Sequence, residues 1–218
     1  MARASVPSRP VDDRFGALFS AITAGDAEAV GAVLARVPAA ASSRGPDGVS
    51  AILRARYLGR HDLVALIEAA GADLDVFDAA ALGRVEHLDV LLSIDPMLAV
   101  AWSPDGFTPI ALAAFFAEPG AVRTLIDAGG DSVADEPARN PMKVTALHAA
   151  VAGRSLEVVE LVLSAGADVN RAQQGGVTPL HEAVRNGDAE VESLLLAHGA
   201  DPTRRDDQGR TPEDLRAP

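Results

Sequence analysis

The 218-residue sequence contains no cysteine, and this absence excludes several kinds of site. Disulfide bridges, a catalytic thiol and zinc sites with thiolate ligands all require cysteine side chains. The N-terminal segment MARASVPSRP has two arginines but no apolar run after them, so it does not fit a secretory signal. No stretch is long and apolar enough to span a bilayer. We therefore expect a cytoplasmic protein that is not bound to a membrane.

Aromatic and basic residues are also scarce. Aromatic side chains make up 4% of the sequence, and the formal net charge is -12 with a pI of about 4.7. Such a charge repels phosphate backbones, so nucleic acid is not an expected partner, whereas a basic peptide or a basic protein face is favoured. The same charge also keeps a protein soluble. Lys143 is the only lysine, and together with abundant alanine this favours a bacterial, GC-rich genome.

A motif recurs every 33 residues in the C-terminal half. The segments Thr145-Ala146-Leu147-His148, Thr178-Pro179-Leu180-His181 and Thr211-Pro212-Glu213-Asp214 are in phase, as are Gly166-Ala167-Asp168 and Gly199-Ala200-Asp201. This pattern resembles the ankyrin repeat, in which such motifs flank a pair of helices. The resemblance implies an all-α solenoid of stacked helix-turn-helix units with short β-hairpin fingers. We expect about six repeats plus a truncated C-terminal cap.

The motif also makes physical sense residue by residue. Thr178 can cap the N-terminus of a helix, and Pro179 fits the first helical position, where a missing N–H costs nothing. Gly187 suits the left-handed turn that ends this helix. Leu195 belongs to an apolar face on the next helix. One such unit cannot bury that face alone, so neighbouring units must stack.

The periodicity also predicts the domain organisation. We expect a flexible tail at residues 1–11 and a single ankyrin-repeat domain at residues 12–218. Its predicted repeats lie approximately at residues 12–44, 45–73, 74–101, 102–139, 140–172 and 173–205, followed by a cap at 206–218. Terminal repeats are expected to depart from the pattern.

The N-terminal half is irregular in an ordered way. Gly83 follows Gly59 by only 24 residues, so the third repeat lacks nine residues, those that would form its finger. Several landmarks instead recur after 58 residues, namely Gly25 and Gly83, Pro38 and Pro96, Asp47 and Asp105, and Gly71 and Gly129. We therefore hypothesise that a two-repeat block, with a fingerless first member, was duplicated in tandem.

Neither a catalytic nor a metal site is predicted. His148 and His181 occupy equivalent repeat positions, where the ankyrin resemblance implies that histidine hydrogen-bonds backbone groups. Asp12-Asp13 and Asp206-Asp207 are neighbours whose side chains diverge on regular structure, so they do not suggest a general acid and base. No phosphate-binding loop, zinc-binding His pair or Cys/His framework is present. We expect no enzyme activity and no cofactor.

Large side chains gather at variable repeat positions. In ankyrin proteins the finger tips and the ends of the first helices line a concave groove that usually binds a protein. Aromatic residues and arginine often anchor such interfaces, and exposed apolar clusters often mark them. The candidate partner-binding residues are Arg56, Tyr57, Leu58, Trp102, Phe107, Phe115, Phe116, Arg185 and Asn186.

Two interpretations of these residues remain open. The missing finger of the third repeat can leave a notch beside repeat two, flanked by aromatics, or Trp102, Phe115 and Phe116 can fill the gap. The leading function is a monomeric protein–protein interaction module, acting as an adaptor, an inhibitor or an immunity-type neutraliser. The alternatives are a small-ligand-binding or enzymatic use of the groove, and a structural role in a larger assembly.

Overall fold

The computed structural model describes residues 15–216, which form twelve α-helices arranged in pairs. The expected tail at residues 1–11 and the pair Asp12-Asp13 lie outside these described residues. The first helices of the pairs are α1 (Gly16–Ala24), α3 (Ala51–Tyr57), α5 (Val76–Ala81), α7 (Pro109–Phe115), α9 (Ala146–Gly153) and α11 (Pro179–Asn186). The second helices are α2 (Ala27–Arg36), α4 (His61–Ala69), α6 (Val85–Ile94), α8 (Pro119–Asp127), α10 (Leu156–Ser164) and α12 (Ala189–Ala197).

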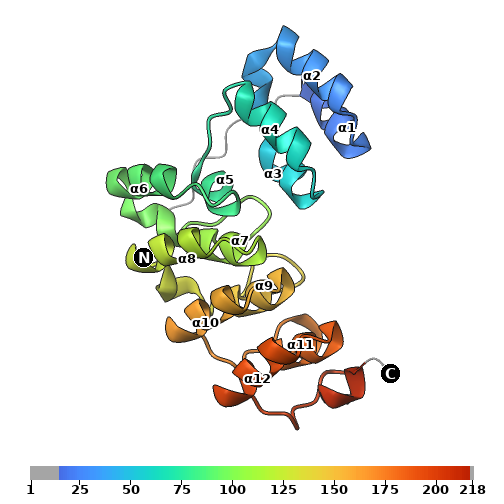
Figure 1. The fold of residues 1–218 in the computed structure, drawn as a ribbon, viewed down its shortest axis with the longest axis vertical. Helices are drawn as coiled ribbons and strands as arrows, with labels where there is room; N and C mark the ends of the chain where they lie inside the picture. Colours follow the sequence, from blue (N-terminus) through green and yellow to red (C-terminus); the bar gives the residue numbers. More distant parts are fainter. Residues whose placement is uncertain (1–14, 217–218) are drawn as a thin grey trace.

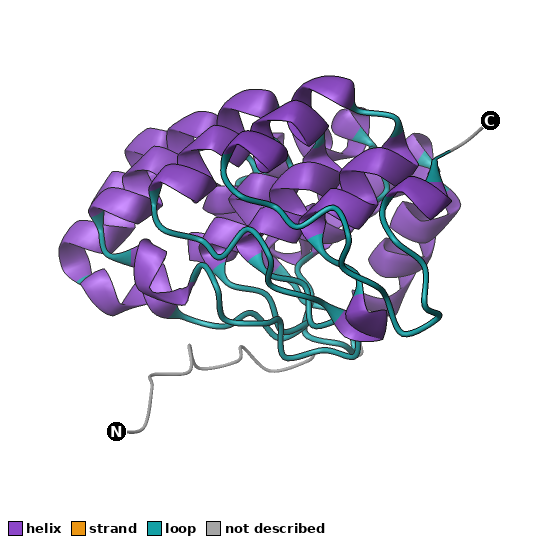
Figure 2. Cartoon of the chain, turned by 90° about the horizontal axis from the view of Figure 1, so that it is seen from below, coloured by secondary structure: helices purple, strands orange, loops and turns teal. Residues whose placement is uncertain are grey.

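The pairs stack into a curved solenoid with two helix layers (Figure 1). First helices pack on first helices and, with one exception, second helices pack on second helices. The connecting loops gather on one side of these layers (Figure 2), and we call the surface formed by the first helices and these loops the first-helix face. No helix within residues 15–216 is long and apolar enough to cross a membrane. The predicted all-α solenoid is confirmed.

Helix ends follow the predicted local chemistry. The Thr178 hydroxyl accepts a hydrogen bond from the backbone N–H of His181, and Pro179 occupies the first position of α11. Gly187 ends α11 with a φ of 67°. Short 3-10 helices complete several repeats, namely η2 (Pro38–Ser42), η3 (Pro96–Val100), η4 (Gly130–Val133), η5 (Gln174–Gly176) and η6 (Glu213–Leu215).

The fingers are tight turns, which corrects the expectation of β-hairpins. Across the described residues the only β-type pairing is one isolated bridge, between Arg44 and Ser50. Each finger has a backbone N–H···O=C bond of 2.8–2.9 Å across its base, for Gly45–Val49, Ser103–Phe107, Ala138–Val144, Gln173–Val177 and Asp206–Arg210. The first finger adds a second such bond, from the Ala51 N–H to the Ser43 carbonyl at 3.0 Å, and this pairing forms the isolated bridge.

Neighbouring fingers in the C-terminal half are joined by backbone hydrogen bonds. Arg139 N–H donates to the Gly106 carbonyl at 2.8 Å, and the fingers that follow repeat this bond through the amides of Gln174 and Asp207. The equivalent donor position in the preceding finger, directly after Ser103, is Pro104, which has no N–H. This finger therefore cannot make the same bond to a finger on its N-terminal side.

The third repeat lacks a finger, as predicted, because only residues 70–75 separate α4 from α5. The flanking fingers meet directly instead. A Cβ added at Gly48 would lie 2.6 Å from Cβ of Pro104, so only glycine allows this approach. The two flanking fingers thus close part of the space that the missing finger would occupy.

The helix bounds support the duplication hypothesis. Adding 58 to the bounds of α2, η2, α3 and α4 gives the bounds of α6, η3, α7 and α8. The remaining pair differs, because α5 has six residues where α1 has nine. The shorter α5 is wholly buried, whereas α1 at the end of the stack is partly exposed.

The apolar core consists of two clusters that divide within repeat two. One cluster joins the first two repeats through Leu18, Ile22, Leu63 and Ile67, and the other runs from Val49 and Leu53 through Phe77 into the later repeats. The second helices α4 and α6, which flank this division, make little contact and lie apart (Figure 1). We call the region where α3, α5 and α7 meet the junction.

Candidate partner-binding site

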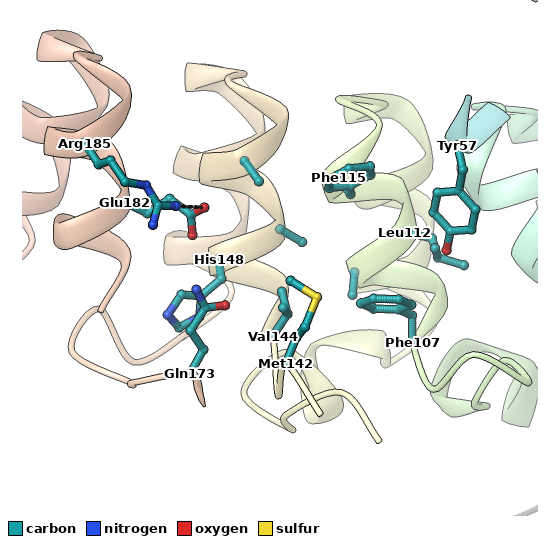
Figure 3. A pocket seen from close by; sticks show the side chains of 13 residues that line it. Tyr57, Phe107, Leu112, Phe115, Met142, Val144, His148, Gln173, Glu182 and Arg185 are labelled. Carbon is teal, nitrogen blue, oxygen red and sulfur yellow. Dashed lines mark hydrogen bonds and ion pairs between the residues drawn. The ribbon is translucent and has the colours of Figure 1, made fainter. Parts of the chain in front are cut away.

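The first-helix face contains a cavity of about 360 Å³ beside the junction (Figure 3). Its walls come from the end of α3, from α7, α9 and α11, and from the fingers between them. The lining residues are Tyr57, Phe107, Ala111, Leu112, Phe115, Met142, Val144, His148, Ala149, Ala152, Gln173, Glu182 and Arg185. The cavity therefore crosses several repeats, and no single repeat contains it.

An aromatic cluster forms one wall. The rings of Phe115 and Phe116 meet nearly edge to face, with centroids 5.0 Å apart, and the Tyr57 ring lies 5.5 Å from Phe116. Tyr57 and Phe115 end α3 and α7, 58 residues apart, and the short, buried α5 allows them to approach. Tyr57 and Phe115 are 36% and 42% exposed, so the wall combines packing with accessible apolar surface.

The Tyr57 hydroxyl fixes the position of the tyrosine ring in this wall. It donates a hydrogen bond of 2.8 Å to the carboxylate of Asp105, in the finger before α7. Burial, followed by the negative charge of Asp105, raises the pKa of the Tyr57 hydroxyl. The tyrosine thus stays protonated and holds α3 to the finger of repeat four.

The opposite end of the cavity combines apolar and charged groups. Met142 projects from the finger before α9 and is 59% exposed, beside the buried Val144. On α11, Arg185 donates to the Glu182 carboxylate at 2.9 Å. Burial raises the pKa of Glu182, while Arg185 opposes this shift. The Arg185 side chain is 51% exposed and presents its positive charge at the rim.

His148 is the one histidine in the cavity wall, and its ring nitrogens are both engaged. Nδ1 lies 2.8 Å from the Thr145 hydroxyl, and Nε2 lies 3.0 Å from the Val177 carbonyl. Burial lowers the pKa of His148 to about 4, so the ring is neutral at pH 7. His181 makes the same links to Thr178 and the Arg210 carbonyl, which confirms the expected backbone-bonding role of both histidines. Neither ring is available as a general base.

Arg56, a predicted binding residue, instead lies across the junction. Its guanidinium donates to the Ala81 carbonyl at 3.0 Å and to Glu118 at 2.7 Å, and it lies 4.7 Å from the centre of the Phe116 ring. Its side chain is only 13% exposed. Arg56 therefore ties three repeats together and does not line the cavity.

Trp102 is also away from the cavity, because it is only 8% exposed. The Arg139 guanidinium covers its ring at 4.2 Å, and its indole N–H is buried without a partner. Trp102 and the half-buried Phe116 fit the gap-filling interpretation. Leu58 is 46% exposed and Asn186 is half-buried, and neither lines the cavity.

Four of the nine candidates meet in the cavity wall, namely Tyr57, Phe107, Phe115 and Arg185. Sequence reasoning missed Met142 and Glu182 as candidates. The repeat register offered a signal for Glu182, which follows the repeat-motif residue His181 and precedes Arg185 by three positions on the same helix. No periodic signal marks Met142, because it lies in the finger that carries four additional residues.

Other chemistry has little support in the described part of the chain. Within residues 15–216 no group of three or more His, Asp or Glu side chains could hold a metal ion. The adjacent Asp206 and Asp207 have different roles, since the Asp206 carboxylate binds Arg210 in the last finger, while the Asp207 amide donates to Gly175.

Comparison with known proteins agrees with this architecture. The family model "Ankyrin repeats (3 copies)" matches residues 76–173 and 135–206. The chain is 32% identical over 131 residues to the human B-cell lymphoma 3 protein, covering 55% of this chain and 28% of that protein. It is 34% identical over 122 residues to the human neurogenic locus notch homolog protein 4, covering 56% of this chain and 5% of that protein.

The chain thus spans less than a third of either relative, and the similarity concerns the repeat region. Ankyrin repeats generally mediate protein–protein interactions and are typically non-enzymatic. The matched residues extend from α5 to the final finger and make up more than half of the sequence. The chain belongs to the ankyrin-repeat family.

Proposed function

We propose that this protein is a non-enzymatic binding module that holds a protein or peptide partner on its first-helix face. The cavity carries this proposal, because its wall exposes the large apolar side chains of Tyr57, Phe115 and Met142. Exposed apolar surface that surrounds a concavity is typical of interaction sites. In the cell the module would act as a monomeric cytoplasmic adaptor, inhibitor or neutraliser, within the single domain proposed for residues 12–218.

The binding residues that we propose are those of the cavity wall, with Tyr57, Phe107, Phe115, Met142 and Arg185 as its contact side chains. Arg56 and Trp102 do not line the cavity but pack against residues next to its wall. Arg56 packs on the Phe116 ring, and Trp102 packs under Arg139 of the following finger. A rigid scaffold of this kind loses little conformational entropy on binding. The proposal therefore rests on a preformed site.

The test compares two methionines. Met142→Asp places a charge in the cavity wall, whereas Met97→Asp places one on η3, where Met97 is 49% exposed. Proteins captured from native extract by the intact chain should be lost with Met142→Asp and retained with Met97→Asp. The melting temperatures of both variants serve as the stability control. Equal capture by the two variants would show that the partner binds elsewhere.

A further inference from the structure

The negative charge of the protein lies mainly on one of its two helix layers. The second helices carry ten acidic and two basic side chains, whereas the first helices carry two acidic and three basic ones. One of the two acids in the first layer, Asp78, is fully buried in α5. The second helices therefore carry a net charge of -8 and the first helices +1, while residues outside the helices carry the remaining -5 of the total of -12.

Of the two charged side chains in the cavity wall, the positively charged one is the more accessible. Glu182 and Arg185 are its charged members, and their side chains are 13% and 51% exposed. Arg185 donates to Glu182 through one nitrogen, and a guanidinium has five N–H donors. A partner therefore meets the arginine more readily than the carboxylate.

The surroundings add further positive charge. Lys143 lies between the lining residues Met142 and Val144 and is exposed. Arg154 is exposed at the end of α9, and its guanidinium donates to the Asn186 carbonyl at 3.4 Å. At the other end, the Asp105 carboxylate accepts a hydrogen bond from the hydroxyl of the lining residue Tyr57.

We propose, on the basis of the binding function above, that the cavity takes a peptide segment carrying a large apolar side chain close to an aspartate or glutamate. The apolar side chain enters between Phe115 and Met142, and the acidic side chain reaches the Arg185 guanidinium. Arginine binds carboxylates through two parallel hydrogen bonds when its donors are accessible. Net charge alone favoured a basic partner, but the charge that a partner meets is local to the binding face.

The probe for this proposal is a phage-displayed library of random 12-residue peptides, selected on the full-length chain. Selected sequences should combine Leu, Met or Phe with a nearby Asp or Glu, and synthetic copies should bind more weakly as salt is raised. Binding of each peptide is measured by fluorescence anisotropy. A selected set dominated by Lys and Arg would overturn the proposal.

Charge reversal then tests the contact directly. Arg185→Glu should weaken binding of the acidic peptide on the order of tenfold, and replacing the peptide's acid with lysine should recover much of the loss. Arg36→Glu on α2 makes the same charge change on the second-helix layer and should leave the affinity nearly unchanged. Equal effects of the two reversals would reject the Arg185 contact and leave only long-range electrostatics.

Met142→Asp separates this proposal from the binding function on which it rests. Peptides that lose affinity with Met142→Asp but not with Arg185→Glu would retain the cavity as a binding site and overturn the acidic-partner proposal. If no peptide is selected, or if those selected ignore Met142→Asp, both proposals fail. Met97→Asp is the matched control for each measurement.

Discussion

The junction and the C-terminal stack solve the same packing problem in different ways. Between α7 and α11 the fingers are linked by backbone hydrogen bonds, such as Arg139 N–H to the Gly106 carbonyl. At the junction one finger is missing, and side chains make the links instead. Arg56 binds Glu118, and the Ser50 hydroxyl donates to the buried Asp78 at 2.5 Å. Side-chain hydrogen bonds and ion pairs at the junction thus replace the backbone bonds that link neighbouring fingers in the C-terminal stack.

The comparison extends to the third residue of each first helix. His148 in α9 and Asp78 in α5 occupy this position, and both are buried. The histidine bonds to a carbonyl of the following repeat, whereas the aspartate accepts from a hydroxyl of the preceding one. Asp75, the residue that caps α5, also forms an ion pair with Arg44. The junction is therefore the more ionic of the two regions.

The largest expected effect tests whether the junction is as well packed as the stack. Phe77→Ala removes a ring that is 2% exposed in α5 and should lower the free energy of unfolding by about 3–5 kcal/mol. Urea unfolding followed by circular dichroism measures the change. Val90→Ala on α6, where Val90 is 56% exposed, should cost less than about 0.5 kcal/mol. A loss below about 1 kcal/mol for Phe77→Ala would show a loose junction.

The next prediction concerns the ion pairs of the two regions. Arg56→Ala should lower the free energy of unfolding by about 1–3 kcal/mol, because Glu118 and the Ala81 carbonyl lose a charged donor. Arg123→Ala breaks a pair with Glu157 whose members are 57% and 56% exposed, and should cost less than about 1 kcal/mol. Thermal unfolding of both variants measures the stability that each one loses. Equal losses of stability would contradict the bridging role of Arg56.

The two regions should respond to pH with opposite signs. Burial, followed by the charge of Asp75, raises the pKa of Asp78 to about 7, so between about pH 4 and 7 the folded state holds a proton that the unfolded state has released. The Asp78 contribution to stability therefore falls as pH rises through this window. The pKa of His148 is lowered to about 4, so its contribution rises with pH between about 4 and 6.5.

Variants separate these contributions. Relative to the unmodified chain, Asp78→Asn should gain stability as pH rises from 4 to 7, and His148→Asn should lose it between pH 4 and 6.5. Each slope is at most about 1.4 kcal/mol per pH unit, the value for one proton. Denaturant titrations across this range measure the slopes. Slopes of the same sign in both variants would rule out the proposed linkage.

The smallest expected effect isolates the contact between fingers. Gly48 and Gly209 both have a φ of 79°, so alanine at either position should cost about 1–2 kcal/mol in backbone strain. A Cβ at Gly48 also collides with Pro104, whereas nothing lies within 4 Å of one at Gly209. In urea unfolding, Gly48→Ala should therefore lower the free energy of unfolding more than Gly209→Ala does, by an additional amount below about 1 kcal/mol. Equal losses would mean that the fingers can separate freely.

Much of the fold was predictable because its determinants are local. Thr178, Pro179 and Gly187 act within one helix, and their roles follow from capping and backbone geometry. The absence of the third finger was likewise visible as a short spacing between Gly59 and Gly83. Hairpin fingers were expected, but within residues 15–216 the fingers form turns with a single isolated bridge, between Arg44 and Ser50.

The candidate site was less predictable, because its walls join residues that are far apart in the chain. Tyr57 and Phe115 were recognised as large side chains at variable repeat positions, but Arg56 and Trp102 share that description and are mostly covered. Their difference depends on neighbours such as Glu118 and Arg139, which sequence periodicity does not place. Met142 was missed because its finger departs from the repeat length.

The sequence by itself determined the repeat register, the helix caps, the missing finger and the 58-residue recurrence of landmarks, since each depends on local spacing. Tertiary structure alone decided which residues make contact where the third finger is missing. Gly48 meets Pro104, and Tyr57 reaches Asp105, because the recessed α5 lets repeats two and four touch. That contact sets one wall of the cavity, and stacking supplies the other from α9 and α11.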